Sequence, residues 1–555
     1  MKHSSLIAFI APILSIATSP PGFSQEVGGR NEVIYQWTGT GSYDSCGYAV
    51  DNVGDFNGDG TPDILIGSPF EENGSKQSAG AVFVYSGVDG KLLRQWKGNW
   101  EYYFFGSTIA GLGDVNNDGL DDIAVGRLYV DSGSGDGGSV KVYSGNGGQL
   151  FAFYGQAESK FGTSVSRAGD VDGDGHDDIL IGAPRDSGFW GNSEAIVYSG
   201  RTGAELYSWQ SSNHADLGTG LSDMGDVNGD GYDDVAIGAP GLRQVFVYSG
   251  ADGNVLFQVS SPNGSHFGEA VSRAGDVDGD GVEDLIVGAP RETYNGINHA
   301  GTATVYSGRT QEVLHHFHGE REIGFFGAAV SDAGDMNGDG IDDVFIGAPY
   351  GGVGEDETGV LFLYSGANGK LIRQWTGHPE SEFGSSIASL GDHYSDAMNR
   401  FIVGAPSYSP GATRTGQAKV YGYTPYMAMS DDVISIVEGG RIQISMDFPH
   451  DAAGYRYKVL ASGSGTGPTT RGIAIPLTFD SLTYKSNQGI YAGVTHLNIH
   501  GTLDTNGDGH AGFDAPAGIN PWLLGQTYWF ATVAIDPNGI PRYSSMASAI
   551  QLRLF

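Results

Sequence analysis

Alternating acids between residues 170 and 178, in the sequence DVDGDGHDD, have the types and spacing of a cation-binding loop. Carboxylates at positions 1, 3, 5 and 9 of a tightly curled backbone can converge on one centre, and Ca²⁺ takes six to eight oxygen ligands. Gly175 at position 6 permits the positive φ of the turn. The residue at position 7, His176, is expected to contribute only its backbone carbonyl.

An EF-hand shares the first half of this pattern but requires a bidentate Glu at position 12 and a helix on each side. Here position 12 is Ile181, inside an apolar run that favours a β-strand. We therefore expect the loop to join two strands, with the carboxylate of Asp178 at position 9 replacing the EF-hand glutamate.

The same loop recurs six times at intervals of 50 to 59 residues. A single copy is more often an Asx-rich turn, but six copies in one register, each followed by a strand, favour metal sites and predict about six Ca²⁺ ions. The predicted ligands, at positions 1, 3, 5, 7 and 9, are Asp55, Asn57, Asp59, Thr61 and Asp63; Asp114, Asn116, Asp118, Leu120 and Asp122; Asp170, Asp172, Asp174, His176 and Asp178; Asp226, Asn228, Asp230, Tyr232 and Asp234; Asp276, Asp278, Asp280, Val282 and Asp284; and Asp335, Asn337, Asp339, Ile341 and Asp343.

A seventh copy of the loop begins at Asp392, but it lacks glycine at position 6 and has Arg400 at position 9. We predict that this copy binds no metal.

Each repeat contains four strand signals, which predicts an all-β fold with a seven-bladed β-propeller. The fourth-strand pattern first occurs at Val33–Trp37, before the first loop, whereas the last repeat stops after its third strand, at Ala418–Tyr423. We expect Val33–Trp37 to complete the seventh blade, because a closed ring leaves no exposed sheet edge.

Two further motifs accompany the loops. Phe-Gly begins at residues 105, 161, 267, 326 and 383, and Gly-Ala-Pro at 182, 238, 288, 347 and 404. Together with the acidic loop they resemble the FG-GAP repeats of the integrin α-subunit propeller, over about residues 33–423. The resemblance implies Ca²⁺ on one face and ligand binding on the opposite face. Cys46 and Leu217 replace the phenylalanine, Ser68 replaces one alanine, and Arg127-Leu128 replaces one Ala-Pro.

Composition and charge limit the classes of binding partner and the location that we expect for this protein. The formal charge of −36 argues against nucleic acid and anionic membranes, which attract basic surfaces. Residues 1–24 resemble a secretory signal peptide, so we expect a secreted, extracellular or periplasmic protein, and no later run is long enough to span a membrane. With Cys46 alone, no internal disulfide can form.

The repeat defines the domain organisation. We expect the propeller to occupy residues 33–424. The repeat period then ends, and residues 430–555 show alternating strands separated by Gly, Pro and Ser, which predicts a small β-sandwich module. A half-loop at Asp504, Asn506 and Asp508 is interpreted as a turn.

The expected ligand surface consists of the loops that follow each Gly-Ala-Pro or lead into each Phe-Gly, on the face opposite the Ca²⁺ loops. A protein or glycan ligand would suit exposed aromatic and arginine side chains, although these side chains could equally pack their own loops. They are Trp100, Tyr102, Tyr103, Tyr129, Phe189, Trp190, Tyr294, Tyr350, Tyr408, Arg127, Arg185 and Arg291.

We expect a non-catalytic binding or adhesion module. The alternative is an extracellular polysaccharide lyase, hydrolase or phospholipase-like enzyme, because propellers also carry such activities. The acids of this face, Glu71, Glu72, Asp131, Glu355, Asp356 and Glu357, show no paired spacing that would mark an acid and a base.

Two other charged patterns carry structural expectations. His315, His316 and His318 are interpreted as a solvated strand edge rather than a metal cluster. Arg167, Asp223, Arg273 and Asp332 occupy equivalent positions on four consecutive inner strands. We expect them to form a ladder of alternating charge around the central axis, because a partly buried charge requires a partner.

Overall fold

The computed structural model describes residues 26–425 apart from 128–136, 158, 185–191, 212–213, 262–264, 353–356, 392–397 and 411–413, and beyond residue 425 the strands named below. The described residues contain strands and no α-helix. A helix long and apolar enough to cross a membrane is therefore absent from this part of the chain. They divide into two compact units, one containing Asn31–Met336 and Ile341–Tyr423, the other containing Thr424–Phe555 with short segments from elsewhere in the chain.

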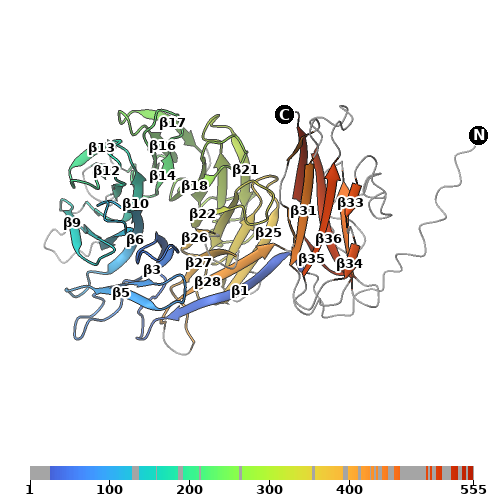
Figure 1. Cartoon of the computed structure of the whole chain (residues 1–555). Coiled ribbons are helices and arrows are strands. Elements are labelled where there is room, and N and C mark those ends of the chain that lie inside the picture. Colours follow the sequence, from blue (N-terminus) through green and yellow to red (C-terminus); the bar gives the residue numbers. More distant parts are fainter. Residues whose placement is uncertain are drawn as a thin grey trace, which may run out of the picture. The chain divides into compact units, whose positions relative to one another are not determined.

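The first unit is a seven-bladed β-propeller (Figure 1). Its blades are four-stranded and follow one another around a common axis. In chain order they are β2 (Ala49–Gly54), β3 (Asp63–Ser68), β4 (Ala81–Tyr85) and β5 (Leu92–Lys97); β6 (Phe105–Gly113), β7 (Asp122–Arg127), β8 (Ser139–Tyr143) and β9 (Gln149–Tyr154); β10 (Ser164–Gly169), β11 (Asp178–Ala183), β12 (Ser193–Tyr198) and β13 (Glu205–Ser211); β14 (Leu221–Gly225), β15 (Asp234–Ala239), β16 (Gln244–Tyr248) and β17 (Val255–Ser260); β18 (Ala270–Gly275), β19 (Asp284–Ala289), β20 (Thr302–Tyr306) and β21 (Val313–His318); β22 (Ala329–Gly334), β23 (Asp343–Ala348), β24 (Thr358–Tyr364) and β25 (Leu371–Pro379); and β26 (Ile387–Gly391), β27 (Asn399–Ala405), β28 (Gln417–Pro425) and β1 (Glu26–Thr38).

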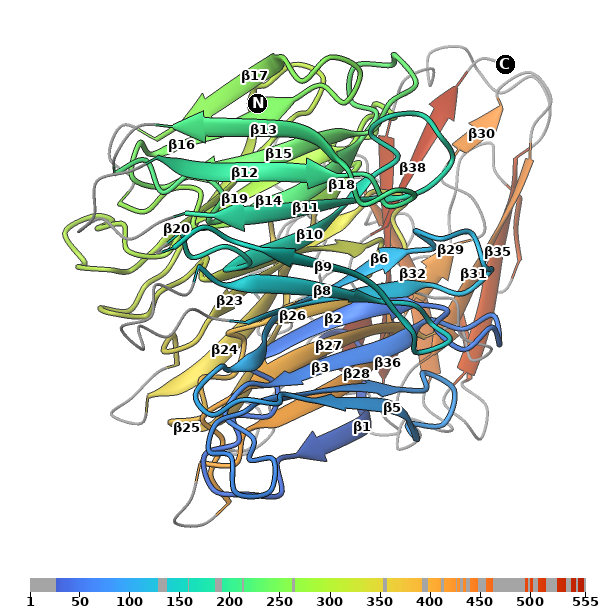
Figure 2. The same ribbon diagram turned by 90° about the vertical axis from the view of Figure 1, so that its left-hand side faces the viewer.

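The pattern of apolar and polar residues in each strand depends on how far the strand lies from the propeller axis. The second strand of a blade is covered on both faces by the neighbouring blades, so β3, β11, β15, β19 and β23 are buried at every residue. Their sequences are accordingly unbroken apolar runs after the leading Asp. The outermost strands, such as β5 and β17, alternate between exposed and partly buried residues. Figure 2 shows the strands β10, β11, β12 and β13 of one blade lying side by side in this order.

The seventh blade is closed by the first strand of the chain. Its strand order is β26-β27-β28-β1 (Figure 1), which confirms the expected pairing of Val33–Trp37 with the last repeat. The innermost strands β2 and β26 also contact each other, so the ring of inner strands is complete. Ile34, Tyr35 and Trp37 pack against the apolar core shared by blades 7 and 1.

Adjacent blades approach each other through the two motif glycines. The N–H of Gly268 donates to the carbonyl of Gly288 in its own blade at 3.0 Å. The carbonyl of Gly268 faces Gly238 of the preceding blade, where an added Cβ would lie 2.1 Å from the oxygen. The same contact recurs in the other six blades. Both glycines are therefore required, whereas the phenylalanine position needs only a buried apolar residue, and Cys46 and Leu217 fill it.

Aromatic stacking joins the outer halves of the blades. The fourth strand of one blade places an aromatic ring against a tyrosine in the third strand of the next blade, with ring centroids 4.2 to 5.0 Å apart. The pairs are Trp37–Tyr85, Trp96–Tyr143, Phe153–Tyr198, Trp209–Tyr248 and Phe317–Tyr364. The first of these pairs lies at the closure between β1 and blade 1.

The expected charge ladder is confirmed in part. Arg273 lies between Asp223, at 3.2 Å, and Asp332, at 3.9 Å. Coulombic attraction to Asp223 is the main cause that raises the pKa of Arg273. The prediction for Arg167 was wrong, because its guanidinium pairs with Asp177 at 2.8 Å. Asp177 lies nearby at the end of the loop in the same blade, so a local partner replaces the neighbour around the ring.

The second unit contains short strands in two sheets, as expected for a β-sandwich. One sheet has the order β29-β31-β35-β33, and the other contains β37-β36-β32-β34 with β38 paired to β36 and β30 to β38. These strands are β29 (Met427–Met429), β30 (Val433–Ser435), β31 (Gly440–Asp447), β32 (Arg456–Ser462), β33 (Thr495–Leu497), β34 (His500–Thr502), β35 (Asp508–Ala515), β36 (Thr527–Ile535), β37 (Pro541–Ser545) and β38 (Ser548–Arg553). Asp508 begins a strand, and Asp504 and Asn506 lie outside the described residues.

The closure can be tested at Trp37. We expect Trp37→Ala to lower the free energy of unfolding by about 2–3 kcal/mol, because it removes a half-buried aromatic side chain from the core between blades 7 and 1. Val33→Ala, at a 50% exposed position on the same strand, is the matched control and should change little. Urea unfolding measures both variants, and equal losses would contradict a closing role for Trp37.

Candidate metal loops and the opposite face

Each acidic loop is organised by its first aspartate. The Oδ1 atom of Asp226 accepts hydrogen bonds from the N–H groups of Gly229 and Asp230, and Oδ2 accepts from Gly231. Gly231 at position 6 has φ of 92° with nothing near its missing side chain, as the turn requires. The loops at Asp55, Asp114, Asp170 and Asp276 repeat these bonds at positions 5 and 6. The carboxylate at position 1 therefore sets the curl that brings the other acids together.

The aspartate at position 9 is fully buried in all six loops. In blade 3, Oδ1 of Asp178 accepts from the N–H of Gly200 at 2.9 Å and Oδ2 accepts from Val171 at 3.0 Å. Asp343 is held in the same way by Gly366 and Met336. Burial raises the pKa to about 7 for Asp63, Asp122, Asp178, Asp234 and Asp284. A nearby cation would offset the cost of a buried negative charge.

The acid at position 8 has a different partner, which the sequence did not reveal. Oδ2 of Asp233 accepts the N–H of Asp170, the first residue of the preceding blade's loop, at 2.8 Å. Asp121 binds Asp55 and Asp342 binds Asp276 in the same way, at 2.6 and 2.9 Å. The Asp-Asp doublet that ends these loops therefore serves two blades. One carboxylate binds its own hairpin, and the other binds the neighbouring loop.

Position 7 also contributes more than a carbonyl. The ring of Tyr232 lies over Gly173 of the preceding loop, where an added methyl group would be 2.7 Å away. Leu120 and Ile341 cover the preceding loops similarly, and Nδ1 of His176 lies 2.9 Å from the carbonyl oxygen of Val115. These side chains pack neighbouring loops together, so their variety reflects contact between blades.

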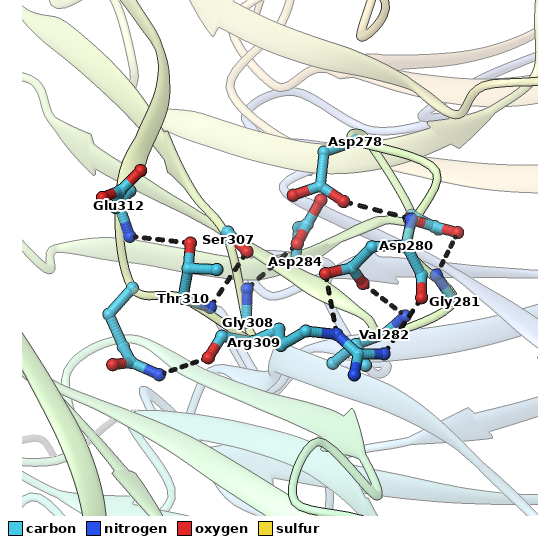
Figure 3. Close-up of polar contacts among 12 residues, drawn as sticks. Asp278, Asp280, Gly281, Val282, Asp284, Ser307, Gly308, Arg309, Thr310 and Glu312 are labelled. Atoms are coloured by element: carbon cyan, nitrogen blue, oxygen red, sulfur yellow. Dashed lines mark hydrogen bonds and ion pairs between the residues drawn. The ribbon is translucent and has the colours of Figure 1, made fainter.

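Position 3 varies together with a distant residue. Loops with Asp at this position, those at Asp170 and Asp276, have an arginine after the Ser-Gly that ends the third strand, whereas loops with Asn have Val88, Asn146, Ala251 or Ala367 there. Arg309 binds Oδ2 of Asp280 at 2.9 Å and its carbonyl at 3.0 Å (Figure 3). Arg201 lies 3.8 Å from Asp174. The extra carboxylate is therefore accompanied by an extra positive charge.

The donors converge as a metal site requires. Asp170, Asp172 and Asp174 present oxygens within 4.8 Å of one another, as do Asp276, Asp278 and Asp284. In blades 1 and 2, Asn57 and Asn116 reach the buried aspartate at position 9 through hydrogen bonds of 2.9 Å. Hard oxygen donors on a rigid turn fit Ca²⁺. The degenerate loop from Asp392 lies outside the described residues, while Arg400 at its position 9 donates to the carbonyl of Gly87 at 3.1 Å.

The opposite face divides the expected aromatic residues into two groups. Tyr350 donates to Glu382 at 2.7 Å, Tyr408 packs on His378 and Tyr294 stacks on His318, so these rings pack against neighbouring loops and strands. Trp100 and Tyr102 are 68% and 46% exposed. Tyr129, Phe189, Trp190, Arg185, Asp131, Glu355 and Asp356 lie outside the described residues. The centre of this face holds a cavity of about 300 Å³ lined by the first residues of the inner strands.

The three histidines of β21 have separate partners. Nδ1 of His316 lies 2.9 Å from the hydroxyl of Thr304, His318 stacks on Tyr294, and His315 contacts the carbonyl of Gly366. Burial is the main cause that lowers the pKa of His316.

The closed ring, the acidic loops and the paired glycines define an all-β propeller built from a repeat with an acidic loop. The FG-GAP repeat model matches residues 47–85, 161–201, 222–256, 267–306 and 326–364. The chain therefore carries a propeller of FG-GAP repeats that is similar to the propeller of integrin α-subunits.

Several integrin α-subunits match part of this chain. Integrin alpha-5 of Xenopus laevis is 33% identical over 30% of this chain, integrin alpha-3 of Cricetulus griseus 34% over 32%, and integrin alpha-PS3 of Drosophila melanogaster 37% over 36%. The matched parts span only 17% to 19% of those relatives. A solved structure of a protein of unknown function from Bacteroides caccae covers 58% of this chain and 97% of that chain, with 11% identity and a TM-score of 0.32, too low a likeness to add to the argument.

A double-mutant cycle without metal can test whether Arg309, which pairs with Asp280, compensates the additional negative charge of Asp278. Arg309→Ala should lower the free energy of unfolding by about 0.2–1 kcal/mol, since the pair is partly exposed. Adding Asp278→Asn should restore most of the loss, because the loop then resembles those with three acids. Urea unfolding in EGTA is the measurement, and Lys91→Ala, which breaks an exposed pair away from the loops, is the control. If the double variant is no more stable than the single one, Arg309 does not compensate Asp278.

Proposed function

We propose that this protein is an exported, non-catalytic binding module whose propeller is stabilised by Ca²⁺. The face of the propeller opposite the acidic loops would bind an extracellular protein or glycan ligand. Export rests on the signal-like residues 1–24, which lie outside the described residues. Residues 33–424 would form the functional propeller and residues 430–555 an accompanying module.

The observation that carries the proposal is the convergence of oxygen donors in loops that sit between blades. Several loops contact the loop of the preceding blade through the acid at position 8 or the side chain at position 7. Bound Ca²⁺ would supply positive charge to carboxylates that otherwise repel one another. The residues that would hold it are those at positions 1, 3, 5, 7 and 9 of the six loops. Six ions would bring the formal charge from −36 to −24.

The ligand surface follows from the direction of the strands. Strands alternate within each blade, so the hairpins that contain the acidic loops and the loops after Gly-Ala-Pro lie on opposite faces. Ligand binding is therefore separated from the metal sites, which can stabilise the scaffold without being covered. The exposed rings of Trp100 and Tyr102 give this face the aromatic character of a recognition surface.

The metal part of the proposal is tested by thermal unfolding with Ca²⁺ and with excess EDTA. Each site occupied at a hundred times its Kd adds about 2.7 kcal/mol to the folded state, so chelation should lower Tm substantially. Elemental analysis should find about six ions per chain, and Asp174→Asn should lose about one of them. Asp252→Asn, in an exposed turn outside the loops, is the control. An unchanged melting curve in EDTA would show that the loops do not bind calcium.

A further inference from the structure

A second binding feature lies at the junction of blades 1 and 2. A cavity of about 460 Å³ is lined by the end of β5 and the loop after it, and by β7, β8 and the end of β9. Its volume falls within the range of small-ligand pockets. The described residues that line it include Lys97, Trp100, Arg127, Lys141 and Tyr154.

Two cations of this pocket differ from the residues that most blades have at the same positions. Arg127 stands where five other blades have a buried alanine of Gly-Ala-Pro. Lys141 stands two residues before the third-strand tyrosine, where blades 1, 4 and 6 have phenylalanine and blade 7 has Lys419. The regular fold requires neither charge at these positions, because the other blades form without the arginine and five of them form without the lysine. Three basic side chains in one pocket are also unusual on a chain with a formal charge of −36.

The positive side chains differ in how they are held. Lys97 binds Glu71 at 2.7 Å, and Nε of Arg127 donates to the hydroxyl of Ser139 at 2.6 Å. The Arg127 guanidinium also lies over the ring of Tyr103, 4.3 Å from its centroid. Among the residues that the structure describes, no carboxylate pairs with Lys141. Lys141 is therefore the cation of the pocket with charge to offer a ligand.

Aromatic rings surround these charges. Trp100 is 68% exposed and Tyr154 is 71% exposed, and Trp100 lies 6.3 Å from Tyr103 between ring centroids. The pocket also includes the stacked pair of Trp96 and Tyr143, which joins the blades and is a rigid part of the fold. Open aromatic faces pack against the C–H faces of a flat, ring-shaped ligand, and basic groups bind its acid by charge-assisted hydrogen bonds.

We propose that the pocket between blades 1 and 2 binds an acidic carbohydrate, with the sugar ring on Trp100 or Tyr154 and its carboxylate at Lys141. This proposal rests on the binding function proposed above and names its site and ligand class. An acidic peptide shares the charge but offers no such ring, and it is the competing ligand that the experiment must separate.

The test uses the full chain in Ca²⁺ buffer and isothermal titration calorimetry with trigalacturonate as the probe. The fully methyl-esterified trimer is the matched probe, because it keeps the sugar rings and removes the charge. We expect the acid to bind at least tenfold more tightly than the ester, and its affinity to fall as salt is added. A triglutamate peptide should bind more weakly than the acid.

Two of the variants, Lys141→Phe and Arg127→Ala, restore residues that other blades use at these positions, so the fold should tolerate them. Lys141→Phe should weaken trigalacturonate binding at least tenfold, and Arg127→Ala and Trp100→Ala should each weaken it as well. Lys91→Ala removes an exposed lysine outside the pocket and should leave binding unchanged. Thermal unfolding of each variant checks that the propeller is intact.

Three results would overturn the proposal: no binding of trigalacturonate, equal binding of acid and ester, or equal binding of triglutamate. Unchanged affinity in an intact Lys141→Phe variant would also overturn it. None of these results affects calcium stabilisation or ligand binding elsewhere on the propeller, which the EDTA experiment and screening with other ligands report separately.

Discussion

The spacing between blades depends on a carbonyl oxygen of one blade that lies where a glycine of the preceding blade would otherwise have its Cβ atom. The Phe-Gly glycine of one blade faces the Gly-Ala-Pro glycine of the preceding blade so closely that no Cβ fits between them. This contact sets how near two sheets approach at the inner strands. The apolar second strands, the aromatic pairs farther out and the acid doublets on the loop face can contact their neighbours only at that separation.

Charge in the acidic loops follows a second constraint. Four carboxylates repel one another more strongly than three, and the two loops with Asp at position 3 are the two whose following hairpin supplies an arginine. The two changes leave the net charge of every loop similar. The sequences of the loops in a repeat protein can in this way differ while the net charge around each site stays similar.

Features repeated within each blade could be predicted from the sequence. Six loops in one register and four strand patterns per repeat indicated a seven-bladed propeller, and the early position of Val33–Trp37 indicated the closing strand. Contacts between blades could not be read in this way. The partner of Asp233 is the backbone of Asp170 in another repeat, and the spacing within one repeat carries no trace of it. The prediction for Arg167 was wrong because Arg167 pairs with Asp177 in its own blade instead of with Asp223 in the next blade.

The aromatic residues of the opposite face show the limit of composition. The sequence could not separate Tyr350, which bonds Glu382, from Trp100, which stays exposed, because both lie in loops expected on the same face. The distinction depends on whether a nearby loop supplies a partner. A departure from the repeat was more informative than its aromatic content, because Arg127 replaces the alanine that five other blades bury and lines a pocket at the junction of blades 1 and 2 together with Lys141.

The seventh blade makes the order of chain synthesis part of the folding problem. The strand β1 is made first, yet its partner β28 is made only after six other blades. Until then the first strand and the last blade each have an unpaired edge, and bringing them together joins parts of the chain far apart in sequence. Once joined, the ring has no terminal blade from which unfolding can spread inward, unlike an open array of repeats. The sheet edges of the propeller are therefore paired only at the end of folding, when β1 joins β28. We expect its blades to unfold together.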